Sequence, residues 1–348
     1  MAVSDRETGI ASDDISLEEK VRFLKEKKNY PHPTADVKAV KTHMSWVFLT
    51  DQFVYKLKIP FRYDHLKLLT PPARHHNCLE EIRLNKRLAE DIYLGVTPLS
   101  VDKEGNLVLG EGERAVDWLV KMKRLPKKTM LEQRIKIGTK ISEVQLQPAA
   151  ELLTNFYLDA QPLHVLPKEQ LEQMKSTLEE SRAELLSPEF NINHPMINRA
   201  YDKQMAFIDE HVDLFKKRIA EGRIIEGHGD LKPDHICLDP PAVIDCLEFS
   251  KQLRTLDVLD DLAFLGLECD RFGAPWVGEY FIRHYAKHAE DASPAKLISF
   301  YKSYRAIIRA LLSVRHLREE QYQGDPKWRE RAKNYLKLAE EYMVLIQW

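Results

Sequence analysis

The chain of 348 residues is long enough for one large domain or two modest ones, and it can bury a sizeable apolar core. Apolar residues make up 44% of it and charged residues 30%, a balance typical of globular proteins that excludes bulk disorder. Lys plus Arg number 52 against 54 for Asp plus Glu, so the formal charge of −2 excludes a whole-protein field that attracts nucleic acid or anionic lipid.

The cysteines and the apolar runs indicate a cytoplasmic protein. The four cysteines are scattered without a C-x-x-C pair, and the first residues lack the apolar stretch of a signal peptide. No apolar run approaches the roughly 18 residues that a membrane-spanning helix needs. We therefore expect a reducing compartment and no membrane partner.

Residues 1–35 are predicted to form an N-terminal tail and a helix. The first 15 residues are polar, and we expect them to fray. Ser16 and Glu19 have the spacing of a capping box, and an apolar face follows until Pro31 stops the helix.

Residues 36–122 are predicted to form a small mixed sheet with one helix. A hairpin is expected from strands at 46–49 and 53–58 around a turn at 50–52, and a helix at 74–89 follows it. Two further strands, at 97–101 and 116–122, flank a glycine-rich turn.

Residues 123–348 are dominated by helices. Amphipathic patterns predict them at about 148–160, 168–186, 196–221, 275–290, 294–320 and 325–347. One non-helical island, residues 224–249, interrupts them and contains a second predicted hairpin at residues 239–241. An island of this kind among helices needs a functional reason.

The island carries the residues that phosphoryl transfer requires. It reads HGDLKPDH from His228 and then VIDCLEF, so the loop carboxylate of Asp230 is followed by a lysine and later by the carboxylate of Asp245. Phosphoryl transfer uses one carboxylate to orient the acceptor hydroxyl and another to hold the metal that bridges the phosphates. By itself, the HGD string is also explained by a turn at Gly229 that Asp230 caps.

This string resembles the aminoglycoside phosphotransferase and choline kinase branch of the protein-kinase-like superfamily, in which glycine replaces the arginine of H-R-D. Residues 30–314 further resemble uncharacterised bacterial aminoglycoside-phosphotransferase-like proteins. The matching segments are THMSWVFLTDQFVYKLKIP, EEIRLNKRLAEDIYLGVTPL, VKMKRLP, HGDLKPDHICL, VIDCLEFS, DVLDDLAFL and FYKSYRAIIRAL. The resemblance implies an α+β, two-lobed protein-kinase-like fold with a small β-rich N-lobe and a large, mostly helical C-lobe.

The resemblance also implies roles for individual residues. Lys56 would bind the α- and β-phosphates of ATP, and Glu81 would be its partner on the following helix. Lys58 lies on the same strand face and competes with Lys56, while Glu80 is the alternative to Glu81. Both lysines are also explained as the outward face of an edge strand.

The remaining nucleotide contacts are expected from two other segments. Neither G-x-G-x-x-G nor a Walker motif occurs, so Ser45 in the turn at 43–45 would take the phosphate-loop position. Lys121, Met122 and Lys123 would belong to the hinge between the lobes and contact adenine through their backbone. The resemblance further makes Asp230 the catalytic base, Lys232 the residue that neutralises the transferring phosphoryl group, and Asp245 the Mg²⁺ ligand.

His235 departs from the family pattern, because this position normally holds a metal-binding asparagine. A neutral imidazole suits Mn²⁺ or Zn²⁺ better than Mg²⁺. The sequence leaves open a site with one metal, a site tuned to another metal, a lapsed catalyst, and a packing role for His235 without metal contact. Tyr157 likewise stands near a position where the family usually has histidine.

Charged residues on the large-lobe helices allow several interpretations. Asp257 and Asp261 resemble carboxylates that brace the catalytic loop, whereas Asp260 is better explained as a helix N-terminal acid. Arg305 and Arg309 stand four residues apart, so they either grip an anionic substrate or, as we favour, form structural ion pairs. Three acids suggest a cationic or polyhydroxylated acceptor, namely Glu248, Glu268 and Asp270.

Together these patterns predict an enzyme that binds ATP and Mg²⁺ between the lobes and transfers the γ-phosphoryl group to a hydroxyl of a small molecule. The alternative is a catalytically lapsed module that binds a nucleotide or metabolite. A third hypothesis, a dinuclear metal hydrolase, would draw its ligands from His228, Asp230, Asp234, His235, Asp239 and Asp245. No aromatic residues interleave with the basic run at 121–136, so no nucleic-acid partner is expected.

Overall fold

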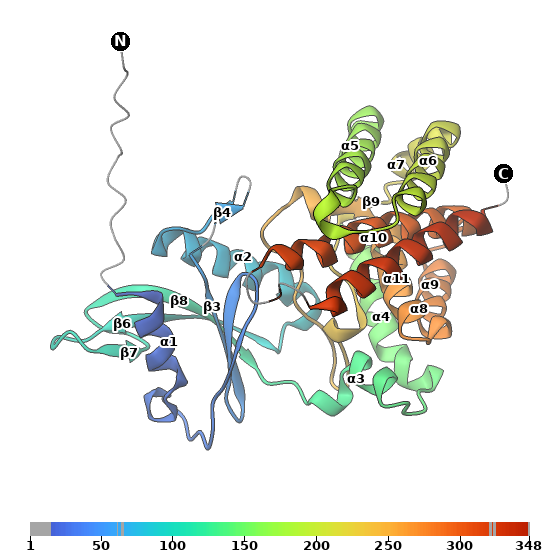
Figure 1. Cartoon of the computed structure of the whole chain (residues 1–348). Coiled ribbons are helices and arrows are strands. Elements are labelled where there is room, and N and C mark those ends of the chain that lie inside the picture. The colour runs from blue at the N-terminus through green and yellow to red at the C-terminus, as the bar shows by residue number, and fades with distance from the viewer. Residues whose placement is uncertain (1–14, 61, 64–65, 320–321, 323–324, 347–348) are drawn as a thin grey trace, which may run out of the picture. The chain divides into compact units, whose positions relative to one another are not determined.

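The computed structural model describes residues 15–60, 62–63, 66–319, 322 and 325–346 (Figure 1). The fraying expected of residues 1–15 concerns a segment that lies outside them except for residue 15. The described chain divides into two compact units. The N-terminal unit comprises the residues up to Thr129 together with Ala242–Ser250, and the C-terminal unit comprises Met130–Pro241 and the residues from Lys251 onward. The boundary expected from the sequence lay after Met122, with residues 242–250 in the larger lobe.

The N-terminal unit is built on a six-stranded antiparallel sheet in the order β1-β2-β3-β8-β6-β7. The strands are β1 Lys38–Lys41, β2 Ser45–Leu49, β3 Phe53–Lys58, β6 Tyr93–Val101, β7 Leu107–Leu109 and β8 Arg114–Lys123. A short ladder joins β4 (Arg62–Tyr63) to β5 (Leu66–Lys67). The predicted hairpin is confirmed as β2 and β3, and Thr50 closes its turn by side-chain and backbone hydrogen bonds with Phe53.

Helices cover the two faces of this sheet. α1 (Leu17–Lys25) packs Val21 and Leu24 against Tyr55 and Leu57 of β3, whereas α2 (Pro71–Ala89) lies against the opposite face (Figure 1). Successive side chains of a strand point to opposite faces, so β3 separates its apolar residues from its lysines. The lysines of β3 therefore face α2.

The predicted capping box at the start of α1 is confirmed. The Ser16 hydroxyl accepts a hydrogen bond from the Glu19 N–H, and the Glu19 carboxylate accepts one from the Ser16 N–H. These bonds satisfy backbone donors that the first helical turn leaves unpaired. The α-helix ends at Lys25, earlier than expected, and a 3-10 turn at Lys27–Asn29 continues the chain toward Pro31.

The C-terminal unit is mostly helical, as predicted. Its helices are α3 Leu131–Lys136, α4 Glu143–Asp159, α5 Pro167–Leu185, α6 His194–Glu210, α7 Val212–Ala220, α8 Val258–Arg271, α9 Pro275–His288, α10 Ala295–Arg315 and α11 Pro326–Leu345. The helix expected from residue 148 begins earlier because Ser142 and Gln145 form a capping box, which leaves Pro148 inside α4. The single helix expected at 196–221 is two helices that meet at His211.

The non-helical island lies between α7 and α8. It contains β9 (Ile224–Glu226), the 3-10 turn Pro233–His235, β10 (Ile236–Leu238) and β11 (Pro241–Val243). β9 pairs antiparallel with β12 (Thr255–Asp257), the strand that runs directly into α8. This pairing fixes the start of the island to the first turn of α8.

The described residues contain no helix that is both long enough and apolar enough to cross a membrane.

Candidate active site

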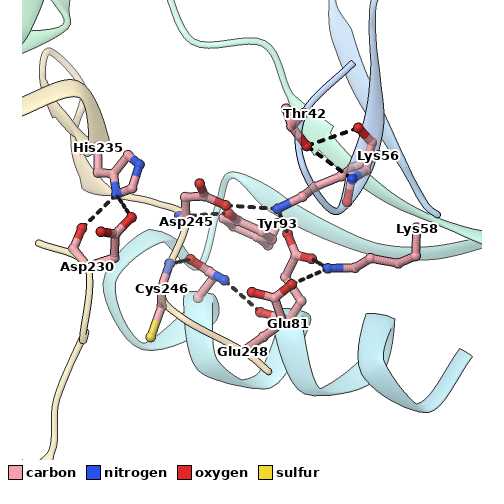
Figure 2. A network of polar contacts seen from close by, with 12 residues as sticks. Thr42, Lys56, Lys58, Glu81, Tyr93, Asp230, His235, Asp245, Cys246 and Glu248 are labelled. Atoms are coloured by element: carbon pink, nitrogen blue, oxygen red, sulfur yellow. Dashed lines mark hydrogen bonds and ion pairs between the residues drawn. The ribbon is translucent and has the colours of Figure 1, made fainter. Parts of the chain in front are cut away.

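Lys56 of β3 lies between two carboxylates of the N-terminal unit (Figure 2). Its Nζ is 3.0 Å from Glu81 Oε1 on α2 and 2.8 Å from Asp245 Oδ1 on the returning segment 242–250. The Lys56 side chain is 13% exposed and that of Asp245 is 46% exposed. This lysine and this aspartate are therefore accessible to a ligand, whereas Glu81 is buried behind them.

Lys58 occupies the next position on the same face and is fully buried. Its Nζ forms ion pairs with Glu81 Oε2 and Glu248 Oε1, so the two lysines share Glu81. Glu80, the alternative to Glu81 in the sequence, instead pairs with Arg83 at 2.7 Å on the exposed side of α2. The sequence associated Glu248 with a cationic acceptor, but the structure pairs this carboxylate with a lysine of its own chain.

The backbone around Asp245 is held from β6 and α2. The Asp245 N–H donates to the Tyr93 hydroxyl at 3.1 Å, and the Cys246 N–H donates to Asn85 Oδ1 at 2.9 Å. Asp245 has φ = 61°, a left-handed conformation that aspartate adopts more readily than most residues. These contacts fix where the Asp245 carboxylate stands relative to Lys56.

Neighbouring charges outweigh burial in setting the pKa values of this cluster. Burial alone would lower the pKa of Lys56, but Asp245, Glu81 and Glu248 hold that pKa well above its usual value. Burial would raise the pKa of Glu248, but Lys58 and Lys56 outweigh it and lower that pKa. The lysines and Glu248 therefore carry their charges at neutral pH.

The loop that carries Asp230 is held by α8 of the C-terminal unit. Asp261 accepts hydrogen bonds from the N–H groups of His228 at 2.7 Å and Gly229 at 3.0 Å, and from the Tyr157 hydroxyl at 3.3 Å. Gly229 has φ = 82°, which favours glycine and gives a physical reason for glycine at this position. Asp261 thus braces the loop as its resemblance implied, and Tyr157 supports it.

The other expected bracing residue, Asp257, has a different local role. It caps α8 through the Leu259 N–H and forms a buried ion pair with Arg218 at 2.6 Å. Asp260, interpreted from the sequence as a helix N-terminal acid, receives two hydrogen bonds from Arg305 at 2.6 and 2.8 Å. The structural ion pair that we favoured for Arg305 is therefore present.

Asp230 is surrounded by positive charge within its own unit. Lys232 Nζ lies 2.9 Å from Asp230 Oδ2 and 3.8 Å from Asp234 Oδ2. Burial would raise the pKa of Asp230, but Lys232, His235 and Arg309 outweigh it and lower that pKa. Asp230 is consequently ionised at neutral pH and can accept a hydrogen bond from a hydroxyl.

His235 is buried against the same loop. Its Nδ1 lies 2.9 Å from the carbonyl oxygen of Asp230. A carbonyl oxygen only accepts hydrogen bonds, so Nδ1 carries the hydrogen and Nε2 carries the lone pair of the neutral ring. This hydrogen bond gives His235 a packing role and also orients its ring in the way a metal-binding histidine is oriented.

The remaining nucleotide-contact candidates lie in β2 and β8. Ser45 begins β2 and is fully buried. Its backbone bonds to Thr42, while its hydroxyl has no hydrogen-bond partner in the described residues. Lys121 lies opposite Tyr55 in the register, so its side chain stands over Phe53 on the α1 face, away from Lys56. Met122, opposite Val54, shares the Lys56 face, and the Lys123 N–H donates to the Ile92 carbonyl.

Comparisons with known proteins were made by sequence and by structure. No known protein-family model matches the chain. Two uncharacterized proteins, from Mycobacterium bovis and Mycobacterium tuberculosis, are each 31% identical over 319 residues. The matched region is 90% of this chain and 61% of each relative, so the chain spans about three fifths of the length of these curated relatives.

Solved structures are similar over almost the whole chain. A choline/ethanolamine kinase family protein from Mesorhizobium loti has a TM-score of 0.53 and 15% identity, and covers 94% of this chain and 94% of its own. The GDP complex of wild-type aminoglycoside 2'-phosphotransferase-IIIa has a TM-score of 0.52 and 12% identity, and covers 94% of this chain and 99% of its own. The chain has the two-lobed, protein-kinase-like fold. The α+β fold class expected from the sequence is thereby confirmed, and the similarity to small-molecule phosphotransferases with it.

The fold raises the question of whether these residues suit a nucleotide with Mg²⁺. Asp245 offers a half-exposed carboxylate, the oxygen donor that Mg²⁺ prefers, whereas His235 offers a nitrogen donor that suits Mn²⁺ better. Among the described residues, no group of three or more His, Cys, Asp or Glu side chains is arranged to hold a metal. Such a group is not needed for Mg²⁺, which is usually held by one or two carboxylates together with substrate phosphates. The dinuclear hydrolase would need such a group, and the described residues do not provide one.

Proposed function

We propose that this chain is a phosphotransferase that moves the γ-phosphoryl group of ATP to a hydroxyl of a small molecule. The observation that carries the proposal is the position of Lys56, whose ammonium group contacts both the buried Glu81 and the accessible Asp245. A lysine anchored by one carboxylate and adjacent to a second, accessible one is suited to bind phosphates next to a metal ion. The protein-kinase-like fold supports the same assignment.

The proposed roles follow from charge and hydrogen bonding. Lys56 binds the α- and β-phosphates, and Glu81 holds its ammonium group in place. Asp245 is the carboxylate that would hold Mg²⁺ or Mn²⁺, and the cation would supply positive charge that offsets the negative charge of the phosphates. Ser45, Met122 and the backbone of Lys121 and Lys123 remain candidates for nucleotide contact, although the buried Ser45 hydroxyl requires movement of its turn to reach a phosphate.

Asp230 is proposed as the base. The acceptor hydroxyl donates a hydrogen bond to the Asp230 carboxylate and gives up its proton as its oxygen forms a bond to the γ-phosphorus. The bond between the γ-phosphorus and the β–γ bridging oxygen breaks, and ADP leaves with that electron pair. Lys232, 2.9 Å from Asp230, is positioned to offset the charge of the transferring group.

Transfer of label from γ-³²P-ATP to a mixture of hydroxyl compounds tests the proposal. Asp230→Asn and Asp230→Ala are expected to lower kcat by about 100- to 10,000-fold, because proton transfer loses its acceptor. Binding of ATP, measured by calorimetry, should persist in both variants since Lys56 and Asp245 are intact. Full transfer by Asp230→Ala would contradict the assignment of the base.

His235 decides between the active enzyme and a lapsed, nucleotide-binding module. Exchange to asparagine restores the oxygen ligand found in related proteins and keeps an N–H donor for the Asp230 carbonyl. If the histidine limits the use of Mg²⁺, His235→Asn should raise activity with Mg²⁺ relative to Mn²⁺. Metal-independent binding of ATP without turnover in both forms would favour the lapsed module.

A further inference from the structure

The acids of α8 are already neutralised by residues of the C-terminal unit itself. Glu268 accepts hydrogen bonds from Arg271 at 2.9 Å and from the Tyr335 hydroxyl at 2.5 Å. Asp270 pairs with Lys302 at 2.8 Å, and Asp260 with Arg305. From the sequence, Glu268 and Asp270 suggested a cationic acceptor. Such an acceptor would have to break an existing ion pair at each carboxylate and would leave a buried arginine or lysine without its counter-charge.

Arg309 differs from Arg305, which lies one turn before it on α10. Arg305 makes two hydrogen bonds to Asp260, whereas Arg309 Nε is 3.5 Å from its carboxylate neighbour, Glu268 Oε1. Arg309 Nε is a buried atom without a hydrogen-bond partner in the described residues, although the side chain as a whole is 17% exposed. The guanidinium of Arg309 also lies over the rings of Phe264 and Tyr335, and its long ion pair is with a carboxylate that is already bonded to Arg271 and Tyr335.

The face of α10 that carries Arg309 lies against the loop of the proposed base, because Arg305, one turn earlier, places its Nη1 3.5 Å from the Gly229 carbonyl oxygen. Burial would raise the pKa of Asp230, and the charge of Arg309 acts with that of Lys232 to lower it. Asp234 offsets part of the Lys232 charge at 3.8 Å, and Glu268 offsets part of the Arg309 charge at 3.5 Å, but Arg309 Nε makes no hydrogen bond in the described residues. A ligand that approaches Asp230 within this unit therefore meets a guanidinium group with hydrogen-bonding capacity.

We propose that the acceptor is an acidic hydroxyl compound whose carboxylate or phosphate group binds Arg309 while its hydroxyl faces Asp230. This inference rests on the proposed function for the identity of Asp230 as the base. A planar guanidinium matches both anionic groups with paired hydrogen bonds. A cationic acceptor would instead be repelled by Arg309 and would find the α8 carboxylates occupied.

Calorimetric titration of the full chain without nucleotide tests the inference. The probes are D-gluconate for a carboxylate, ribose 5-phosphate for a phosphate, ribitol for a neutral polyol and choline for a cation. We expect at least one anionic probe to bind at least tenfold more tightly than ribitol and choline. The anion that binds more tightly shows whether Arg309 recognises a carboxylate or a phosphate. Arg309→Gln should weaken the anion at least tenfold, and Arg309→Lys should weaken it less because the charge remains.

A matched control lies on the same helix. Arg315 pairs with Glu184 at 2.7 Å, and Arg315→Gln should leave anion binding unchanged. Circular dichroism establishes whether each variant is folded. If Arg309→Gln does not fold, Arg309→Lys still tests the inference. Equal binding of anions and ribitol, or anion binding that survives in both Arg309 variants, overturns the inference.

The phosphotransfer assay separates this inference from the proposed function. With an acceptor that binds, Arg309→Lys should raise its KM at least tenfold and change kcat by less than threefold. Anion binding that depends on Arg309 without any phosphoryl transfer would refute the proposed function and leave the anion site standing. Transfer to choline or an aminoglycoside, with a KM insensitive to Arg309, would refute the acidic acceptor and leave the phosphotransferase standing.

Discussion

Lys56 and Lys58 sit on one strand face but have different surroundings. Both contact Glu81, yet only Lys56 also contacts the accessible Asp245, while Lys58 is enclosed with Glu81 and Glu248. Strand periodicity predicted that the two lysines share a face, and it carries no information on which one is enclosed. The distinction depends on Glu248, which lies 190 residues from Lys58 in the sequence.

This difference predicts that Lys58 contributes mainly to stability and Lys56 mainly to ligand binding. Lys58→Met leaves two buried carboxylates short of a counter-charge and should lower the free energy of unfolding by about 3–5 kcal/mol. Lys56→Met removes a partly exposed cation, so it should cost less stability and abolish most of the affinity for ATP. Urea unfolding and ATP calorimetry measure the two effects.

The control for this pair is Lys103→Met, because Lys103 is 81% exposed and lies 3.9 Å from Glu113. An exposed pair of this kind contributes about 0–1 kcal/mol, so this variant should remain close to the parent protein. Equal loss of stability in the two β3 variants would contradict the division of roles.

Glu248 predicts a dependence of stability on acid. Its pKa is lowered in the folded chain from the usual value of 4.5, because Lys58 and Lys56 outweigh burial. The folded state therefore releases this proton more readily than the unfolded state, and the stabilisation is complete above about pH 4.5 and declines as pH falls through the folded pKa. Urea midpoints between pH 6 and pH 3.5 should fall more steeply in the parent protein than in Glu248→Gln, which is less stable at neutral pH. Parallel pH profiles would show that Glu248 is not the group responsible.

At the scale of elements, local patterns predicted what local forces determine. The α1 capping box, the β2–β3 hairpin and the long helices all follow from spacings of a few residues, and each is present. The break between α6 and α7 at His211 was missed because the apolar pattern runs through it. The pairing of β8 with β3 sets which β8 side chains, such as Lys121, lie on the α1 side. No pattern in the sequence shows that pairing.

The loop of Asp230 is an element whose shape depends on one side chain. Asp261 accepts from two consecutive backbone N–H groups, and these bonds orient the turn that precedes Asp230. Asp261→Asn replaces one acceptor oxygen by an NH₂ donor that faces an N–H group. We expect kcat to fall by about 10- to 100-fold through misplacement of the base, with ATP binding retained.

Tyr157→Phe is the milder companion of that variant, because it removes only the 3.3 Å hydrogen bond to Asp261. Its kcat should lie between those of the parent protein and Asp261→Asn. A loss of ATP affinity equal to the loss of kcat in Asp261→Asn would indicate general unfolding rather than misplacement of the loop.

The packing of α8 on α9 depends on two glycines. A Cβ on Gly278 would lie 2.6 Å from the Gly266 Cα, which is backbone and cannot yield without moving a helix. A Cβ on Gly266 would lie 2.7 Å from Lys302 Cε, the end of a flexible side chain. Gly278→Ala should therefore lower the free energy of unfolding by about 1–3 kcal/mol. Gly266→Ala should cost less, since the end of the Lys302 side chain can move aside, whereas the gain in helix propensity of about 1 kcal/mol applies to both variants. Thermal unfolding compares them, and the reverse order would refute this account of the contact.

At the scale of the whole molecule, the residues assigned to nucleotide binding are drawn from distant parts of the chain into one unit. Segment 242–250 contributes Asp245 and Glu248 to the N-terminal unit, although both of its ends continue into the C-terminal unit. The sequence predicted the role of Asp245 from a motif but assigned this segment to the larger lobe. The ion pairs with Lys56 and Lys58, together with the backbone hydrogen bonds to Tyr93 and Asn85, reveal where the segment belongs.

This arrangement predicts that segment 242–250 gains and loses protection together with β3 and α2. In hydrogen exchange measured by mass spectrometry, Lys58→Met should accelerate exchange in peptides from 242–250, β3 and α2, because all three lose a shared buried counter-charge. Peptides from α8 and α10 should exchange as in the parent protein, and Lys103→Met should change none of them. ATP with Mg²⁺ should slow exchange in the same three segments, since a ligand stabilises the state that binds it. Acceleration across α8 and α10 as strong as that in 242–250 would mean that the segment is held by the C-terminal unit instead.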